Sequence, residues 1–131
     1  MGSNNESPDL VNHPPHYAFS KIEAIDVIEE WHVSPHIANT IKYIARCDKK
    51  FDMVEDLKKA LWYIDRYISY MKNQRFASPP PMYYVKDQTY SIDSVLNEWK
   101  LRDEFSSILR QIYVGHYLGA QVLLNNYVNS L

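Results

Sequence analysis

Two stretches of the sequence resemble each other over three predicted helices, and this repeat constrains the fold more than any other feature. "VIEEWHVSPHIANTIKYI" aligns with "VLNEWKLRDEFSSILRQI", so that Trp31 falls on Trp99, 68 positions later. Farther along, "ALWYIDRYI" aligns with "AQVLLNNYV" at an offset of 60, so the second copy lacks eight residues of the "CDKKFDMVED" region. Amphipathic helices share part of such a pattern by chance. Agreement in the same order through three helices favours an internal duplication.

The apolar residues of both copies recur at helical spacing. We expect a first helix from a Ser20–Glu23 capping box to about Trp31, with Ile22, Ile25, Val27 and Ile28 as its apolar residues. Further helices are expected from Pro35, from about 52 to 72, and near 92–100, 103–114 and 117–130. "MYYVKDQTY" is the one stretch suited to a short strand. The sequence therefore predicts a compact, mostly α domain of two pseudo-repeated three-helix units.

These units set the expected organisation of the chain. Residues 1–11 read as a flexible N-terminus, 12–74 as the helical unit that carries the site, 75–91 as a proline-rich joint, and 92–131 as a degenerate second unit. Three helices bury only a thin core, so we expect the second unit to take the place of a partner subunit.

Composition excludes several classes of protein. The net charge of −2 argues against a nucleic-acid coat and against a polybasic membrane anchor. No apolar run approaches the ~20 residues of a membrane span, and the polar N-terminus does not resemble a signal peptide. A single cysteine, Cys47, fits a reducing compartment. We therefore expect a cytoplasmic protein that binds neither nucleic acid nor membrane.

The first copy carries cations and aromatic residues that the second copy lacks. Arg46 falls on Val114 and Lys59 on Gly119. Helical spacing gives the second and third predicted helices one polar face each, and we expect these faces and the loop between the helices to border one binding site. Its candidate ligand-binding residues are Asn39, Lys42, Tyr43, Arg46, Lys49, Lys50, Glu55, Lys59 and Trp62. Cations beside aromatic rings suit a ligand with phosphates and a base. The alternative is a solvated surface with weak pairs between lysine and glutamate.

Before the first helix, "HPPHY" places His13 and His16 around two prolines and ahead of Tyr17. Zinc binding would need further histidine or cysteine ligands at a suitable spacing, which the chain does not offer. Two interpretations stay open. The stiff loop delivers imidazoles to a ligand with little loss of entropy, or His16 and Tyr17 fasten the N-terminal arm to the helices.

The motifs "NHPPHY", "IEAIDVIEEW", "ANTIKYIARCDKK" and "EDLKKALWYIDRYI", in this order, resemble a small tailed-phage family. That family is catalogued as a domain of unknown function and often labelled a nucleotide kinase. The resemblance covers about residues 12–70 and implies a helical, homo-oligomeric phage protein that handles nucleotides without a P-loop. The chain departs from the family at Ala18, Ala38 and Cys47-Asp48, where the family usually has small residues that include glycine. Losing them narrows or reshapes a binding loop.

Three functions follow as hypotheses. The first is capture of a nucleotide or a nucleotide-derived signal without chemistry and without a cofactor, which would counter host defence in the infected cell. The second is a nucleoside monophosphate kinase without a P-loop, in which Glu55 and Asp56 hold Mg²⁺. A related all-α pyrophosphatase is disfavoured because Val33 stands where its E-E-x-x-E motif needs a glutamate. The third is a helical adaptor without a small-molecule ligand.

Overall fold

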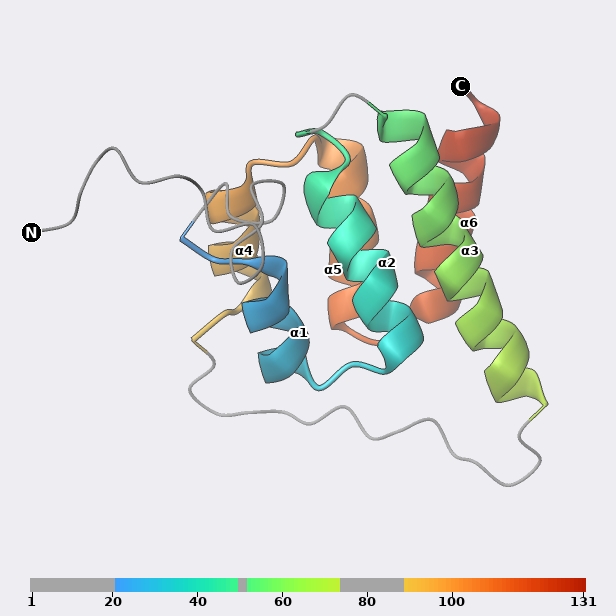
Figure 1. The fold of residues 1–131 in the computed structure, drawn as a ribbon, viewed down its shortest axis with the longest axis horizontal. Coiled ribbons are helices and arrows are strands. Elements are labelled where there is room, and N and C mark those ends of the chain that lie inside the picture. Colours follow the sequence, from blue (N-terminus) through green and yellow to red (C-terminus); the bar gives the residue numbers. More distant parts are fainter. Residues whose placement is uncertain (1–20, 50–51, 74–88) are drawn as a thin grey trace, which may run out of the picture.

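The protein is described by a computed structural model over residues 21–49, 52–73 and 89–131. These ranges contain six α-helices and no strand. The helices are α1 (Ala24–Trp31), α2 (Pro35–Arg46), α3 (Met53–Lys72), α4 (Ile92–Trp99), α5 (Asp103–Tyr113) and α6 (Tyr117–Asn129) (Figure 1). The all-α prediction is confirmed. Among the described helices, none combines the length and the apolar composition needed to cross a bilayer.

Local sequence signals account for several helix starts. Ser34 is the N-cap of α2, where its hydroxyl accepts a hydrogen bond from the backbone of Ile37, and Pro35 occupies the first turn. The expected capping box of α1 is wrong by about one turn. Glu23 is the N-cap, and its backbone N–H donates to Asp26 at 2.9 Å. Thr89 and Tyr90, the described end of the stretch suited to a strand, do not form a strand. The remaining residues of that stretch, 82–88, lie outside the described ranges.

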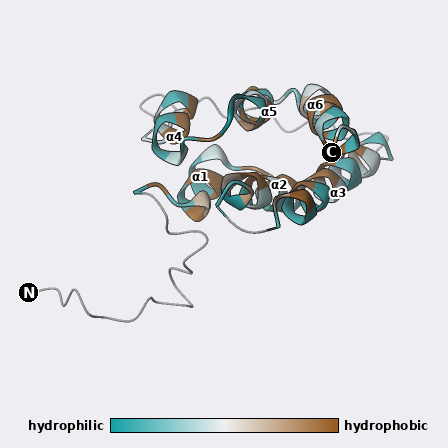
Figure 2. Cartoon of the chain, turned by 90° about the horizontal axis from the view of Figure 1, so that it is seen from above, coloured by the Kyte–Doolittle hydropathy of each residue, from teal (hydrophilic) through white to brown (hydrophobic). Residues whose placement is uncertain are grey.

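The helices form two layers of three, with α1, α2 and α3 in one layer and α4, α5 and α6 in the other (Figure 2). Within the layers α2 packs on α1 and α3, and α5 packs on α4 and α6. Between the layers α3 contacts α6 and α2 contacts α5. Each pairing inside the first layer thus has a counterpart inside the second.

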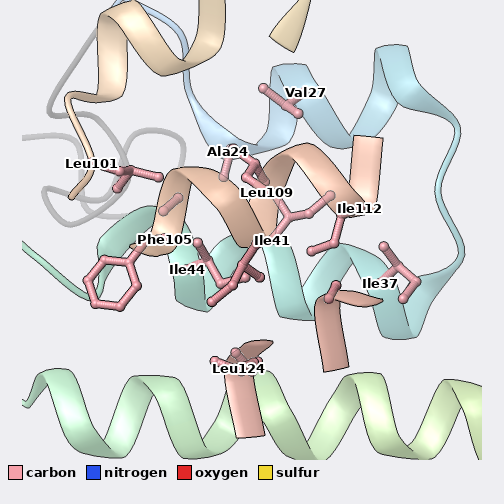
Figure 3. Close-up of a cluster of buried hydrophobic side chains, with 14 of the residues drawn as sticks. Ala24, Val27, Ile37, Ile41, Ile44, Leu101, Phe105, Leu109, Ile112 and Leu124 are labelled. Carbon is pink, nitrogen blue, oxygen red and sulfur yellow. The ribbon is translucent and has the colours of Figure 1, made fainter. Parts of the chain in front are cut away.

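The core lies between the layers and draws on both of them. Ile41 and Ile44 from α2 meet Leu109 and Ile112 from α5, and Leu124 of α6 closes the cluster near α3 (Figure 3). All five side chains are almost fully buried. Ile25, which the helical pattern placed with the core, is instead 51% exposed on α1. Burial of the shared apolar surface is the main force that holds the layers together.

The offset of 68 in the sequence recurs in the structure. His32 and Lys100 end α1 and α4 with the same left-handed backbone, φ 51° and ψ 44°. The Trp31 indole donates to the Tyr90 carbonyl at 2.7 Å. The Trp99 indole donates to the Ile22 carbonyl, also at 2.7 Å. Donors and acceptors in these two bonds are each 68 positions apart, as a two-fold relation between the layers requires. The correspondence supports the duplication, which stays a prediction.

Candidate functional site

A buried ion pair joins the end of α2 to the start of α3. Arg46 donates to the Oδ1 atom of Asp56 from Nε at 3.1 Å and from a terminal guanidinium nitrogen at 2.9 Å. The two side chains are only 9% and 1% exposed. The cation lies in the last turn of α2 and the anion in the first turn of α3. Each charge therefore also interacts favourably with the dipole of its own helix. The pair therefore fixes the hairpin on which the candidate site is built.

A second polar contact sets the distance between these helices. The Thr40 hydroxyl donates to the Ala60 carbonyl of α3 at 3.1 Å, and both residues are fully buried. The small side chain of Ala60 lets the helix backbones approach closely at this point. Polar residues one and two turns farther along α2 are thereby held against the outer face of α3.

Tyr43 is the centre of a cluster of cations and aromatic rings on this face. The Arg46 guanidinium lies 5.0 Å from its ring centroid, and the Lys59 ammonium lies 5.6 Å from it. The Tyr63 ring stacks on it at 6.0 Å with an interplanar angle of 14°. Cations over an aromatic face are attracted by the ring's quadrupole. Two positive charges are thus held at one tyrosine, and we call Tyr43, Arg46, Lys59 and Tyr63 the Tyr43 cluster.

Trp62 extends the cluster towards solvent. Its ring meets Tyr63 edge-on at 5.0 Å, and the residue is 59% exposed. It borders an open hollow of about 530 Å³ in the surface of α3, whose other lining residues are Asp52, Val54, Glu55, Lys58 and Lys59. An exposed indole beside two lysines offers a flat apolar surface and positive charge at the same place.

Glu55 holds Lys59 at the edge of the hollow. The ammonium and the Glu55 carboxylate are 2.7 Å apart, one helical turn from each other on α3. This hydrogen bond raises the pKa of Lys59 above its ordinary value. Lys59 is therefore fully charged at neutral pH and can exchange one anionic partner for another.

The structure brings together only part of the predicted site. Tyr43, Arg46, Glu55, Lys59 and Trp62 are connected through the Tyr43 cluster and the hollow. Asn39 and Lys42 are partly exposed on α2, and Lys49 is exposed just beyond it. The remaining predicted positions lie outside the described residues: His13, His16, Tyr17 and Lys50.

The two carboxylates expected to hold Mg²⁺ in an enzyme do not converge. Asp56 points into the hairpin against Arg46, whereas Glu55 lies on the exposed face against Lys59. Neighbouring residues of a helix point about 100° apart, so only one of them faces the hollow. The described residues contain no group of three or more histidine, cysteine or carboxylate side chains arranged for a metal ion.

Tyr63, which the sequence pattern groups with Tyr43 and Trp62 as a ring suited to a base, stacks on Tyr43. Residues of the hollow such as Lys58 and Val54 were not among the predicted contacts. Lys58 lines the hollow one helical turn before Trp62, and Val54 lines it one turn before Lys58. Their spacing along α3 was a usable signal, because residues three and four apart share a helix face.

Cys47 is buried at the base of the hairpin and takes no part in this surface. Its side chain is fully enclosed, and its thiol lies 3.2 Å from the Ile44 carbonyl. Burial raises the pKa of the Cys47 thiol to about 12, and the negative charges of Asp48 and Asp56 act in the same direction. The thiol is therefore unsuited to act as a nucleophile at neutral pH.

Comparison with known proteins gives a family match only in the first half of the chain. No curated protein and no solved structure matches it. Residues 11–65 match a family described as a protein of unknown function, DUF3310. The match includes α1, α2 and most of α3, and so contains the Tyr43 cluster and the hollow, while α4, α5 and α6 lie beyond it. The first unit is thus similar to a family whose function is not established.

Proposed function

We propose that this protein captures a nucleotide or a nucleotide-derived signalling molecule on the outer face of α2 and α3. One observation carries the proposal: the Tyr43 ring holds two cations, beside an exposed Trp62 at an open hollow. A nucleotide combines charged phosphates with a flat base. Lysines neutralise the charge of the phosphates, and an indole stacks on the base.

In this proposal, different residues of the face contact different parts of the ligand. Lys58 and Lys59 line the hollow, and in this proposal their ammonium groups contact the phosphate oxygens. Arg46 is buried against Asp56, so its role here is to hold the Tyr43 ring in place. Trp62 offers the base a stacking surface, an interaction worth about 1–3 kcal/mol per base.

Capture fits this arrangement better than phosphoryl transfer. A kinase needs carboxylates that hold Mg²⁺ against the transferred phosphate. Here Glu55 turns outward to Lys59 and Asp56 turns inward to Arg46. A binding protein needs only a pre-formed surface, which loses little entropy when the ligand arrives. The Tyr43 cluster, with its ion pair and its stacked rings, is such a surface.

The biological role rests on the resemblance to phage proteins. A small protein that binds a nucleotide-derived signal in the cytoplasm of an infected cell lowers the free concentration of that signal and so counters host defence. The predicted contacts from His13, His16 and Tyr17 would add to the same site. The second unit, in which Lys59 and Trp62 are replaced by Gly119 and Val122, serves as scaffold.

Binding measured on matched variants tests the proposal. Calorimetry with the full chain would survey AMP, ADP, ATP, cyclic dinucleotides and ADP-ribose, with adenosine and inorganic phosphate as partial ligands. Trp62→Ala is expected to weaken the best ligand about tenfold to a hundredfold, because one stacked base is lost. Lys59→Ala is expected to weaken phosphate-bearing ligands more than adenosine.

Two substitutions on the same helix provide controls. Tyr70→Ala removes an exposed aromatic residue and Lys72→Ala an exposed lysine, both near the far end of α3. Both are expected to bind as the unaltered chain does. Mass spectrometry of bound and free ligand then separates capture from catalysis. Intact ligand after denaturation supports capture, a more phosphorylated product formed with Mg²⁺ and ATP contradicts it, and no affinity for any of the panel would favour the adaptor.

A further inference from the structure

The hollow on α3 carries acidic side chains as well as lysines. Its lining includes Asp52 and Glu55 together with Lys58 and Lys59, so the formal charges of the lining cancel. A surface that attracts phosphate by charge alone would keep the cations and lack the carboxylates, because the field of the whole patch steers an anion towards it. Nucleotide capture by itself therefore does not explain why a carboxylate lies against one of the two lysines.

Glu55 lies where an anionic ligand would contact Lys59. Its carboxylate is 2.7 Å from the Lys59 ammonium, which is the usual length of a hydrogen bond from an ammonium to a charged oxygen. The same ammonium lies 5.6 Å from the centroid of the Tyr43 ring, so two groups hold it at the edge of the hollow. An ammonium has three donors, but a phosphate on a second donor would lie next to the Glu55 carboxylate and be repelled by it.

Lys58, the other lysine of the hollow, is not held in this way. It is exposed, and the ion pairs within the described ranges do not include it. The two lysines are neighbours on α3 and line the same hollow, so they differ in their pairing more than in their place. Glu55 thus controls one of the two cations that the hollow offers to a phosphate.

We propose that Glu55 is an internal competitor for the phosphate of the ligand: it occupies Lys59 in the free protein and is displaced when an anion enters the hollow. The inference rests on the proposed capture of a nucleotide, and it makes Glu55 a residue that sets affinity and does not contact the ligand. Every ligand that carries phosphate must break the pair between Glu55 and Lys59 before it binds. A nucleoside without phosphate does not use Lys59 and is not affected.

The competitor gives the hollow a selectivity that its lysines alone would lack. An inorganic anion is held by charge alone, so displacement of Glu55 removes much of what it gains. A nucleotide also stacks its base on Trp62, and this interaction does not depend on Glu55. Glu55 therefore keeps the hollow free of simple phosphates and reserves it for ligands that carry both a phosphate and a base.

Titration of the full chain with inorganic pyrophosphate tests the exchange without any nucleotide. The Cε and Nζ signals of Lys59, followed by NMR, report the anion at this side chain. Glu55→Gln keeps the size of the side chain and removes its charge. We expect half-saturation at about threefold to tenfold lower pyrophosphate in Glu55→Gln, because a surface pair and the repulsion of a like charge are both lost.

Two carboxylates of α3 and the turn before it provide matched controls. Asp65→Asn removes a charge outside the hollow, where Asp65 accepts a hydrogen bond from Gln121 at 2.6 Å, and is expected to leave pyrophosphate binding unchanged. Asp52→Asn removes the other carboxylate of the hollow, which is not paired with Lys59. It is expected to tighten binding less than Glu55→Gln does, since only a distant repulsion is lost.

A double-variant cycle separates competition from a structural role. In a chain that already carries Lys59→Ala, Glu55→Gln is expected to change pyrophosphate binding little, because the cation for which Glu55 competes is gone. Glu55 lies in the acidic first turn of α3, where it interacts favourably with the helix dipole. Glu55→Gln is thus expected to lower the urea midpoint slightly while it tightens binding. A purely structural residue would weaken both.

Calorimetry with ADP and adenosine extends the test to the proposed function. ADP is expected to bind Glu55→Gln tighter by about the same threefold to tenfold, and adenosine to bind both proteins equally. If pyrophosphate behaves as expected but no nucleotide binds, the proposed function fails and the competition at Lys59 stands.

Four results would overturn the inference itself. Pyrophosphate leaves the Lys59 signals of Glu55→Gln unchanged at every concentration. Glu55→Gln binds pyrophosphate no tighter than the unaltered chain, or more weakly, as it would if Glu55 contacted the ligand. Asp65→Asn or Asp52→Asn gains as much as Glu55→Gln, which would assign the effect to net charge. ADP binds both proteins equally, which would place its phosphates away from Lys59.

Discussion

Arg46 and Asp56 form the contact on which the α2–α3 hairpin depends. Their charges are buried together, and a buried pair is far more sensitive to the loss of one partner than to the loss of both. We expect Arg46→Ala to lower the free energy of unfolding by about 3–5 kcal/mol, because it leaves the Asp56 carboxylate buried without its cation. Denaturation by urea, followed by circular dichroism, measures this change.

The double variant Arg46→Met with Asp56→Leu separates charge from packing. It is expected to recover most of the lost stability, since apolar residues of similar size replace such pairs at little cost. A loss below about 1 kcal/mol for Arg46→Ala would mean that the pair is screened like a surface salt bridge. Arg46 is consequently a poor position for testing ligand affinity, whereas exposed Trp62 and Lys59 test it without this complication.

Cys47 links stability to alkaline pH. The thiol has an ordinary pKa of 9.0 in the unfolded chain, and burial raises its pKa to about 12 in the folded protein. Between these values the folded state keeps a proton that the unfolded state has lost, so the free energy of unfolding falls as pH rises, by up to about 1.4 kcal/mol per pH unit. Burial also raises the pKa of Tyr67 and of Tyr117, which adds to the fall at still higher pH.

We therefore expect the free energy of unfolding to decrease from about pH 8 to about pH 10.5, and to decrease less steeply in Cys47→Ala. Urea midpoints of the two proteins across this range provide the measurement. The comparison uses slopes, so the constant cost of the small cavity in the variant does not affect it. Parallel pH profiles would show that the thiol does not contribute.

At the scale of single elements, the left-handed ends of α1 and α4 store backbone strain. Lys100 has φ 51° and donates its backbone N–H to the Leu96 carbonyl. An L residue pays about 1 kcal/mol for this conformation, and glycine does not. Lys100→Gly is expected to raise the free energy of unfolding by about 0.5–1 kcal/mol, while Lys100→Val lowers it because β-branching clashes there. Thermal melting distinguishes the two, and equal melting temperatures would contradict the assigned strain.

At the scale of the whole molecule, the two tryptophan bonds tie the layers together. Trp99 donates from a buried position and Trp31 from a partly buried one. Trp99→Phe is expected to lower the free energy of unfolding by about 1–3 kcal/mol, because it removes a buried hydrogen bond. Trp31→Phe is expected to lower it by less, because its hydrogen bond is only partly buried. Trp62→Phe, at an exposed position, is the control and is expected to stay within about 0.5 kcal/mol. Equal losses at Trp99 and Trp62 would show that the bond between layers adds nothing.

Most of the helices could be predicted because their signals are local. Ser34 and Pro35 start α2 through bonds within one turn, and the apolar spacing of Ile37, Ile41 and Ile44 marks the side that is buried. The helical face with Glu55, Lys59 and Trp62 follows from the same spacing. The start of α1 was predicted about one turn too early, because the capping box that forms pairs Glu23 with Asp26.

The sequence by itself determined the helices, their apolar sides and the segregation of cations into the first unit, because interactions among residues three and four apart decide these features. Only the tertiary structure decided that Arg46 is paired with Asp56 inside the hairpin and that Glu55 and Asp56 face different ways. It also decided that Ile25 stays exposed. These outcomes depend on which helix lies against which. Burial changes the energy of a charge or of an apolar side chain by several kcal/mol, and no local spacing reports where burial occurs.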